Sequence, residues 1–203
     1  MQRTILRLIL LATAICISCL GTLAQQDASK RTEPEVDLAF TYSAVRSNLT
    51  TGSNFWLQGG GAELSATVYR GFGVTAAVTG AYANNISPTG VDLTMIITTF
   101  GPRYAWSHKL SAHRDRKLVF FGHGLIGESN GIYSVFPNPG GAQSSANSFA
   151  LQVGGGADID VSRHFAIRLL QADWFRTQFP NGTTSVQNNL RLGAGVVIRI
   201  RMR

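Results

Sequence analysis

Apolar and polar residues alternate along most of the chain beyond residue 36, and no segment there has a strong helical period. In residues 190–201 every even position is apolar, whereas the odd positions are Arg, Gly or Val. Residues 62–68, 72–79 and 151–158 have related patterns. Because a strand places alternate residues on opposite faces, these segments are predicted to be strands with one apolar face.

Eight segments of this kind can be placed along the sequence. They lie near residues 36–47, 55–70, 72–84, 92–107, 117–131, 148–160, 164–177 and 189–201. Each is long enough to cross a bilayer as a tilted strand, which takes about 9–11 residues. The pattern therefore favours strands that turn their apolar faces toward lipid.

The predicted connections alternate between short and long. Residues 70–71 and 161–163 form tight connections, and 108–116 form one of moderate length. The longer connections, rich in Asn, Gly, Ser, Thr and Pro, are 47–54, 84–91, 132–147 and 178–188. Aromatic residues such as Trp56 and Trp174 lie near strand ends, where an interfacial girdle is expected. Together these features predict an all-β fold, an eight-stranded antiparallel up-and-down transmembrane β-barrel.

If the apolar faces contact lipid, a set of charged residues shares the inner face. This predicted lumen charge network contains Asp37, Glu63, Arg103, Asp158, Arg168, Arg191 and Arg199. The alternation leaves Glu128 and Asp173 undecided, because a bulge would change their side. Side chains can fill an eight-stranded barrel, and buried charges must pair with one another. We therefore predict a largely plugged lumen.

Composition narrows the class of protein further. The chain has 203 residues, 14% charged side chains and a formal net charge of +7. This length suits one domain of ordinary size. No run of basic residues is long enough to indicate a nucleic-acid partner.

The first residues have the features of a secretory signal. Arg3 and Arg7 precede an uncharged stretch from Leu8 to Leu20, and Thr22-Leu23-Ala24 follows. We predict a signal peptide over residues 1–24 with cleavage after Ala24, a short N-terminal periplasmic segment over 25–35 and the barrel over 36–203. Cys19 is an alternative site of lipidation, which the sequence leaves open.

The sequence predicts no catalytic, cofactor-binding or metal-binding residues. The four histidines have no zinc-type spacing, and neither Gly-Gly-Gly run is followed by a phosphate-loop signature. Glycine within a barrel strand more often makes room for a large neighbour. His123 lies in an apolar strand and is predicted to be structural.

Several segments resemble the small outer-membrane β-barrel superfamily, the OmpA/OmpX/opacity-type eight-stranded proteins. The segments are FGPRY at 100–104, GGGAD at 154–158, IRLLQADW at 167–174, and NNLR at 188–191 leading into GAGVV at 193–197. The resemblance covers about residues 36–201. It implies a bacterial outer-membrane location, contact with outer-membrane lipids and lipopolysaccharide, insertion by the barrel-assembly machinery, and roles in envelope integrity, adhesion or small-solute passage.

Three hypotheses about function follow. The leading one is a non-enzymatic outer-membrane barrel with a structural, adhesion or surface-interaction role. The second is a lipid A-modifying outer-membrane enzyme that uses His123 with Ser129 or Ser134, although no His-x-Ser pair is present. The third is a soluble lipocalin-like carrier, which requires the two strand faces to be reversed. The sequence identifies no external ligand.

Overall fold

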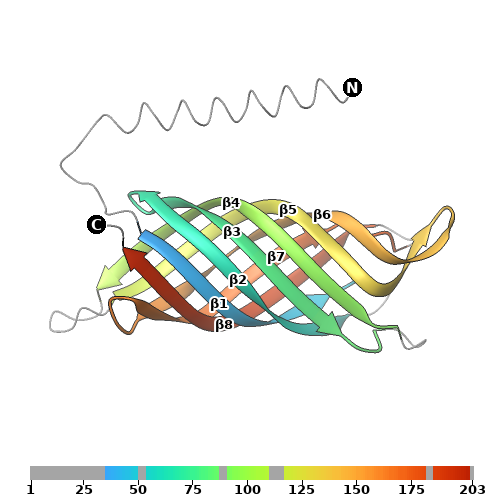
Figure 1. Cartoon of the computed structure of the whole chain (residues 1–203), viewed down its shortest axis with the longest axis horizontal. Helices are drawn as coiled ribbons and strands as arrows, with labels where there is room; N and C mark the ends of the chain where they lie inside the picture. The colour runs from blue at the N-terminus through green and yellow to red at the C-terminus, as the bar shows by residue number, and fades with distance from the viewer. Residues whose placement is uncertain (1–34, 50–53, 87–90, 110–116, 182–184, 202–203) are drawn as a thin grey trace, which may run out of the picture. The chain divides into compact units, whose positions relative to one another are not determined.

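The computed structural model describes residues 35–49, 54–86, 91–109, 117–181 and 185–201, which form eight strands (Figure 1). These are β1 (Glu35–Ser47), β2 (Phe55–Tyr69), β3 (Phe72–Ala83), β4 (Leu93–Lys109), β5 (Lys117–Asn138), β6 (Gly141–Asp160), β7 (Phe165–Thr177) and β8 (Gln187–Arg201). The predicted signal peptide, its cleavage after Ala24, Cys19 and residues 25–34 lie outside the described residues. Among those described, no helix is long and apolar enough to cross a membrane.

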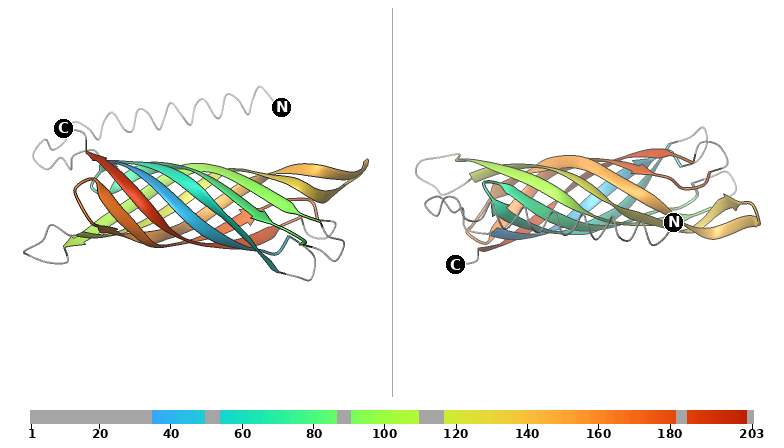
Figure 2. Two further views of the ribbon diagram at one scale, coloured as in Figure 1. Left: turned by 60° about the horizontal axis from the view of Figure 1, so that its bottom comes forward. Right: turned by 90° about the horizontal axis from the view of Figure 1, so that it is seen from above.

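The strands close into one antiparallel barrel in chain order. Each strand pairs with its neighbours along the chain, and β1 closes the sheet by pairing with β8, for example Val36 with Ile200. Figure 2 shows the strands tilted about a common axis. This confirms the predicted all-β, eight-stranded up-and-down barrel, in which closure leaves no open edge along the barrel wall.

The two ends of the barrel differ. We call one the turn end, where β2–β3, β4–β5 and β6–β7 are connected and where β1 begins and β8 ends. The other is the loop end, where β1–β2, β3–β4, β5–β6 and β7–β8 are connected. These names are used below for the two halves of the interior as well.

Alternate residues of each strand point into the barrel and away from it. On β2, Leu57, Glu63 and Ser65 are buried in the interior, whereas Trp56 and Leu64 are exposed on the outer face. The outer face is rich in large apolar residues on all eight strands, among them Phe40, Val74, Phe100, Ile126, Val153, Ile167 and Val196. An outer surface of this kind is the arrangement expected of a barrel in lipid.

Aromatic side chains gather on the outer face toward the turn end. The rings of Phe72 and Tyr104 have centroids 4.6 Å apart, those of Tyr104 and Trp106 6.0 Å, and those of Trp106 and Phe120 5.6 Å. Toward the loop end, Trp56, Tyr82 and Trp174 are exposed on the outer face. The outer face therefore carries aromatic residues near both ends, as interfacial girdles do.

A bulge in β7 decides the side on which Asp173 lies. Leu169 and Leu170 both point outward, and the pairing with β8 shifts between Arg168 and Gln171. The alternation changes phase there, so Arg168 and Asp173 both point inward although their sequence spacing is odd. Glu128, the other undecided residue, is exposed on the outer face.

The predicted loop over residues 132–147 is wrong. β5 continues to Asn138 and β6 begins at Gly141, so two long strands pair almost to the tip of a hairpin. Figure 1 shows this hairpin projecting beyond the other strands at the loop end. The segment's Gly, Pro, Ser and Asn content is typical of loops, but the two strands pair with each other along their facing edges.

Candidate functional site

The interior side chains at the turn end form the first of three charged clusters. Asp37 lies between two arginines, with Arg103 Nη1 3.6 Å from its Oδ2 and Arg199 Nε 3.8 Å from its Oδ1. Arg199 Nη1 is 2.9 Å from Oδ1 of Asp160 and 4.0 Å from Oε1 of Glu35. β1, β4, β6 and β8 therefore place side chains in one cluster across the lumen.

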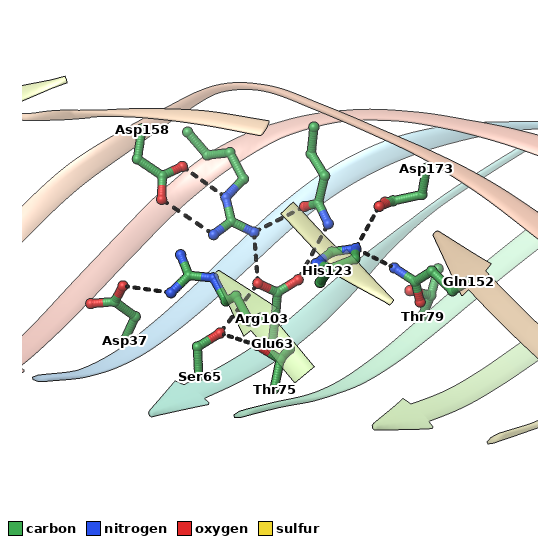
Figure 3. A network of polar contacts seen from close by, with 12 residues as sticks. Asp37, Glu63, Ser65, Thr75, Thr79, Arg103, His123, Gln152, Asp158 and Asp173 are labelled. Atoms are coloured by element: carbon green, nitrogen blue, oxygen red, sulfur yellow. Dashed lines mark hydrogen bonds and ion pairs between the residues drawn. The ribbon is translucent and has the colours of Figure 1, made fainter. Parts of the chain in front are cut away.

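Arg168 is the centre of the second cluster and pairs with Glu63 and Asp158, which Figure 3 labels. Its Nε and Nη2 donate to Oδ1 and Oδ2 of Asp158 at 2.9 and 3.3 Å, a bidentate pair. Its Nη1 donates to Glu63 Oε1 at 3.2 Å and to Gln171 Oε1 at 2.9 Å. Gln171 in turn donates to Glu63 Oε2 at 3.2 Å, so a triangle of polar groups joins β2 to β7.

Phe121 lies close to the guanidinium groups of both of these clusters. Its ring centroid lies 4.7 Å from Cζ of Arg103 and 4.3 Å from Cζ of Arg168. Gly156 faces this ring from β6, where a Cβ would lie only 2.8 Å from Phe121 Cζ. The aromatic ring, on the inner face of β5, offers two buried cations a favourable contact.

The third cluster lies farther toward the loop end and is centred on Asp173. Arg191 donates to Oδ2 of Asp173 through Nε at 2.8 Å and Nη2 at 2.5 Å. His123 Nε2 lies 2.7 Å from Oδ1 of the same carboxylate. Arg191 Nη1 also donates to Thr79 Oγ1 at 2.5 Å. A Cβ at Gly154 would lie 2.1 Å from Asp173 Oδ1, so the absence of a side chain there leaves room for this carboxylate.

The structure places all seven residues of the predicted lumen set in the interior, but in separate groups. It brings Asp37 together with Arg103 and Arg199, and Glu63 together with Asp158 and Arg168. Arg191 belongs to the third cluster, whose acidic member is Asp173. The alternation predicted that each residue lies on the inner face of the barrel, but it carried no information on the residue's partner.

Sequence reasoning missed several residues that complete the clusters. Asp160 pairs with Arg199, Gln171 bridges Glu63 and Arg168, and Gln152 joins His123 and Thr99 at 3.2 and 2.8 Å. For Asp160 the signal was present, because it continues the parity of Asp158. For Gln171 the bulge at Leu169 and Leu170 hid it.

The loop half of the interior contains a large apolar cluster, which the sequence analysis did not predict, beside buried polar side chains such as Thr177 and Gln187. The cluster comprises Val45, Leu49, Leu57, Ala81, Ala83, Ile86, Leu93, Met95, Ile97, Phe136, Ala150, Phe175 and Phe179. The rings of Phe136 and Phe179 have centroids 5.5 Å apart and tilt against each other. This apolar cluster packs side chains from seven strands and their adjoining loops into the lumen.

The interior has few features of a catalytic or metal site. Within the described ranges, no group of three or more His, Cys, Asp and Glu could hold a metal ion. Ser129 lies on the same strand as His123 but six residues farther on, about 20 Å at the rise of a strand. A nucleophile and its base must be within hydrogen-bonding reach, so this pair does not meet that requirement.

Comparison with solved structures places this architecture among known barrels. The attachment invasion locus protein Ail of Yersinia pestis, solved with the heparin analogue sucrose octasulfate, matches with a TM-score of 0.50 and 14% identity, covering 83% of this chain and 100% of that one. Neisserial surface protein A matches with a TM-score of 0.52 and 13% identity, covering 81% and 96%. The fold is that of the small eight-stranded outer-membrane β-barrels. No protein-family model and no curated protein sequence matches the chain.

Proposed function

We propose that this chain is a non-enzymatic outer-membrane β-barrel with a structural, adhesion or surface-interaction role and a largely plugged lumen. One observation carries the proposal: an apolar, aromatic-rimmed outer face surrounds an interior that contains three charged clusters and an apolar cluster. The outer face suits lipid, and the filled interior leaves side chains where a pore would need water.

The proposal assigns partners to each surface. Outer-membrane lipids and lipopolysaccharide contact the outer face, and the barrel-assembly machinery inserts the chain after export. The loop end faces outward, because longer connections lie on the cell surface in barrels of this type. Arg46 and Arg176 are exposed on the outer face toward this end, at the level where anionic headgroups would lie.

Two alternatives have less support. A lipid A-modifying enzyme needs a nucleophile beside its base, and His123 instead contacts Asp173 and Gln152. A lipocalin-like carrier needs a polar outside and a continuous apolar inside. Here Arg168 and Asp158 are buried in the interior, whereas Phe100 and Leu64 are exposed outside.

Membrane fractionation combined with tryptophan quenching tests the placement. We expect the protein in the outer-membrane fraction, resistant to carbonate extraction and heat-modifiable on gels. Trp56, Trp106 and Trp174 are exposed on the outer face, so brominated lipids should quench all three. Release by carbonate, or three tryptophans insensitive to brominated lipid, would contradict the proposal.

A further inference from the structure

The hairpin that projects at the loop end has unpaired strand edges. We call residues 133–149 the arm. β4 pairs with β5 only as far as Ile132, and β7 pairs with β6 only from Ala150 onward among the described residues. The two strands of the arm pair with each other, from Ile132 and Ser145 to Asn138 and Gly141. Figures 1 and 2 show the arm extending beyond the barrel.

The two outer edges of the arm are protected to different degrees. The β5 edge contains Pro137 and an irregularity between Ile132 and Phe136, where Tyr133 has a φ of 60°. Proline and bulges are devices that keep a strand edge from pairing with another chain. The β6 edge, Gly141 to Phe149, contains neither proline nor charge, and residues 129–157 contain no Asp, Glu, Lys or Arg.

We propose that the β6 edge of the arm pairs with the same edge of a second copy of this chain. Antiparallel pairing that uses the whole edge is centred on Ser145, so that Gln143 lies opposite Asn147 of the second copy. Phe149 then lies opposite Gly141, where an aromatic ring can cover the exposed backbone of the glycine. Because the edge is uncharged, self-pairing brings no like charges together, unlike most natural edges.

Symmetry decides how the two barrels are oriented. Antiparallel edges are related by a two-fold axis perpendicular to the strands, so the two barrels point in opposite directions with their loop ends toward each other. Two barrels in one membrane point the same way and present these edges in parallel. The pairing therefore joins barrels in two facing membranes, a consequence that rests on the outward orientation of the loop end in the proposed function.

Two charge variants of equal size test both the pairing and its direction. Gln143 and Asn147 are exposed and lie on the same face of β6, two residues on either side of the centre. Gln143→Lys with Asn147→Lys places lysines opposite each other in either direction. Gln143→Lys with Asn147→Asp places Lys opposite Asp when the strands are antiparallel and like charges opposite each other when they are parallel.

Sedimentation of the folded, full chain in detergent measures the self-association. The wild type should form a dimer as its concentration rises. The double-lysine variant should bind itself about fivefold or more weakly, and the Lys/Asp variant should bind at least as tightly as the wild type. Asn138→Lys, at the tip of the protected β5 strand, is the matched control and should leave association unchanged. A heat-modifiable gel shift confirms that each variant is folded.

Each remaining outcome overturns the inference. A wild type that stays monomeric up to its solubility limit excludes self-pairing. This holds even if a different protein pairs with the edge. Equal weakening of both charge variants indicates parallel pairing within one membrane. Loss of association in Asn138→Lys would show that the two copies associate through the β5 edge and not through the β6 edge. None of these results depends on the membrane from which the protein came, so failure here is distinguishable from failure of the proposed location.

Discussion

The two halves of the barrel interior contain different kinds of side-chain cluster. Three clusters hold five buried carboxylates and four buried arginines with specific partners, and two of these clusters lie in the turn half. In the loop half, apolar residues such as Leu57 and Met95 pack together, and the ring of Phe175 also contacts the guanidinium of Arg191, whose Cζ lies 5.2 Å from the ring centroid. Buried charged groups stabilise the fold only when each meets its partner in a specific geometry, and they destabilise it when one partner is missing. Buried apolar groups stabilise it roughly in proportion to the area that they bury.

The comparison also shows how lipid exposure constrains the sequence. The outer face must be apolar in the band that contacts lipid, so the interior is freer to vary in residue type there. In the turn half, Glu63 alternates with Leu64, and the pattern is visible. In the loop half, Leu57 inside follows Trp56 outside, so both faces are apolar and the pattern is lost.

The largest effect should come from breaking a charged cluster at its centre. Arg168→Ala leaves Asp158 and Glu63 without their shared cation in the interior, at a cost of about 3–5 kcal/mol. Urea unfolding of the folded barrel measures the free energy of unfolding of the wild type and of each variant. Arg176→Ala, on the exposed side of the same strand, should change it by less than about 0.5 kcal/mol. Equal effects of the two variants would show that Arg168 is hydrated rather than paired.

Truncation of a side chain in the apolar cluster should lower the free energy of unfolding somewhat less. The loss there should not depend on a single partner residue. Leu57→Ala removes a fully buried side chain and leaves a cavity, so we expect a loss of about 2–5 kcal/mol. Leu64→Ala, on the outer face of β2, is the matched control and should lose less than half as much. The same unfolding measurement applies. A loss at Leu57 no larger than at Leu64 would show that the apolar cluster is loosely packed.

The third prediction adds volume next to the third charged cluster. Gly154→Ala would place its Cβ 2.1 Å from Asp173 Oδ1 and 2.4 Å from the Ala172 carbonyl oxygen, so the third cluster must shift. We expect destabilisation of about 1–3 kcal/mol. Gly124→Ala is the control, because nothing lies within 4 Å of a Cβ there. Thermal gel-shift midpoints would compare them, and coinciding midpoints would contradict the crowded geometry.

The smallest effect concerns a single hydrogen bond. Thr79→Val removes the acceptor of Arg191 Nη1 while Asp173 still pairs with the guanidinium. The expected loss is about 1 kcal/mol, the size of one hydrogen bond. Thr98→Val, an exposed position on the neighbouring strand β4, should be neutral. An unchanged unfolding midpoint in Thr79→Val would show that Arg191 does not depend on this hydroxyl.

The sequence was sufficient for the fold and for the side on which most charges lie. Alternation requires only period two, and lipid outside makes that period strong wherever the interior is polar, as around Arg191 and Leu192. It failed where this period changes or disappears. The β7 bulge reversed the phase before Asp173, and the arm has a loop-like composition although its strands pair.

Partners within the interior could not be predicted, because they depend on the register of strands distant in the chain. Arg168 meets Glu63 across the lumen, 105 residues apart in sequence. Phe121 contacts two guanidinium groups because β4, β5 and β7 bring them together, and nothing in its local sequence indicates this contact. The face on which a side chain lies follows from local alternation, whereas its partner in the interior follows from closure of the barrel.

Planar-bilayer conductance of the folded wild-type protein tests the central claim most directly. If the charged clusters and the apolar cluster together fill the interior, the inserted barrel should show no large, steady openings. Heat-modifiable migration of the same preparation establishes that the inserted protein is folded. A large, steady conductance of the wild type would contradict the account, because ions would then pass where Arg168, Phe121 and Leu57 are placed.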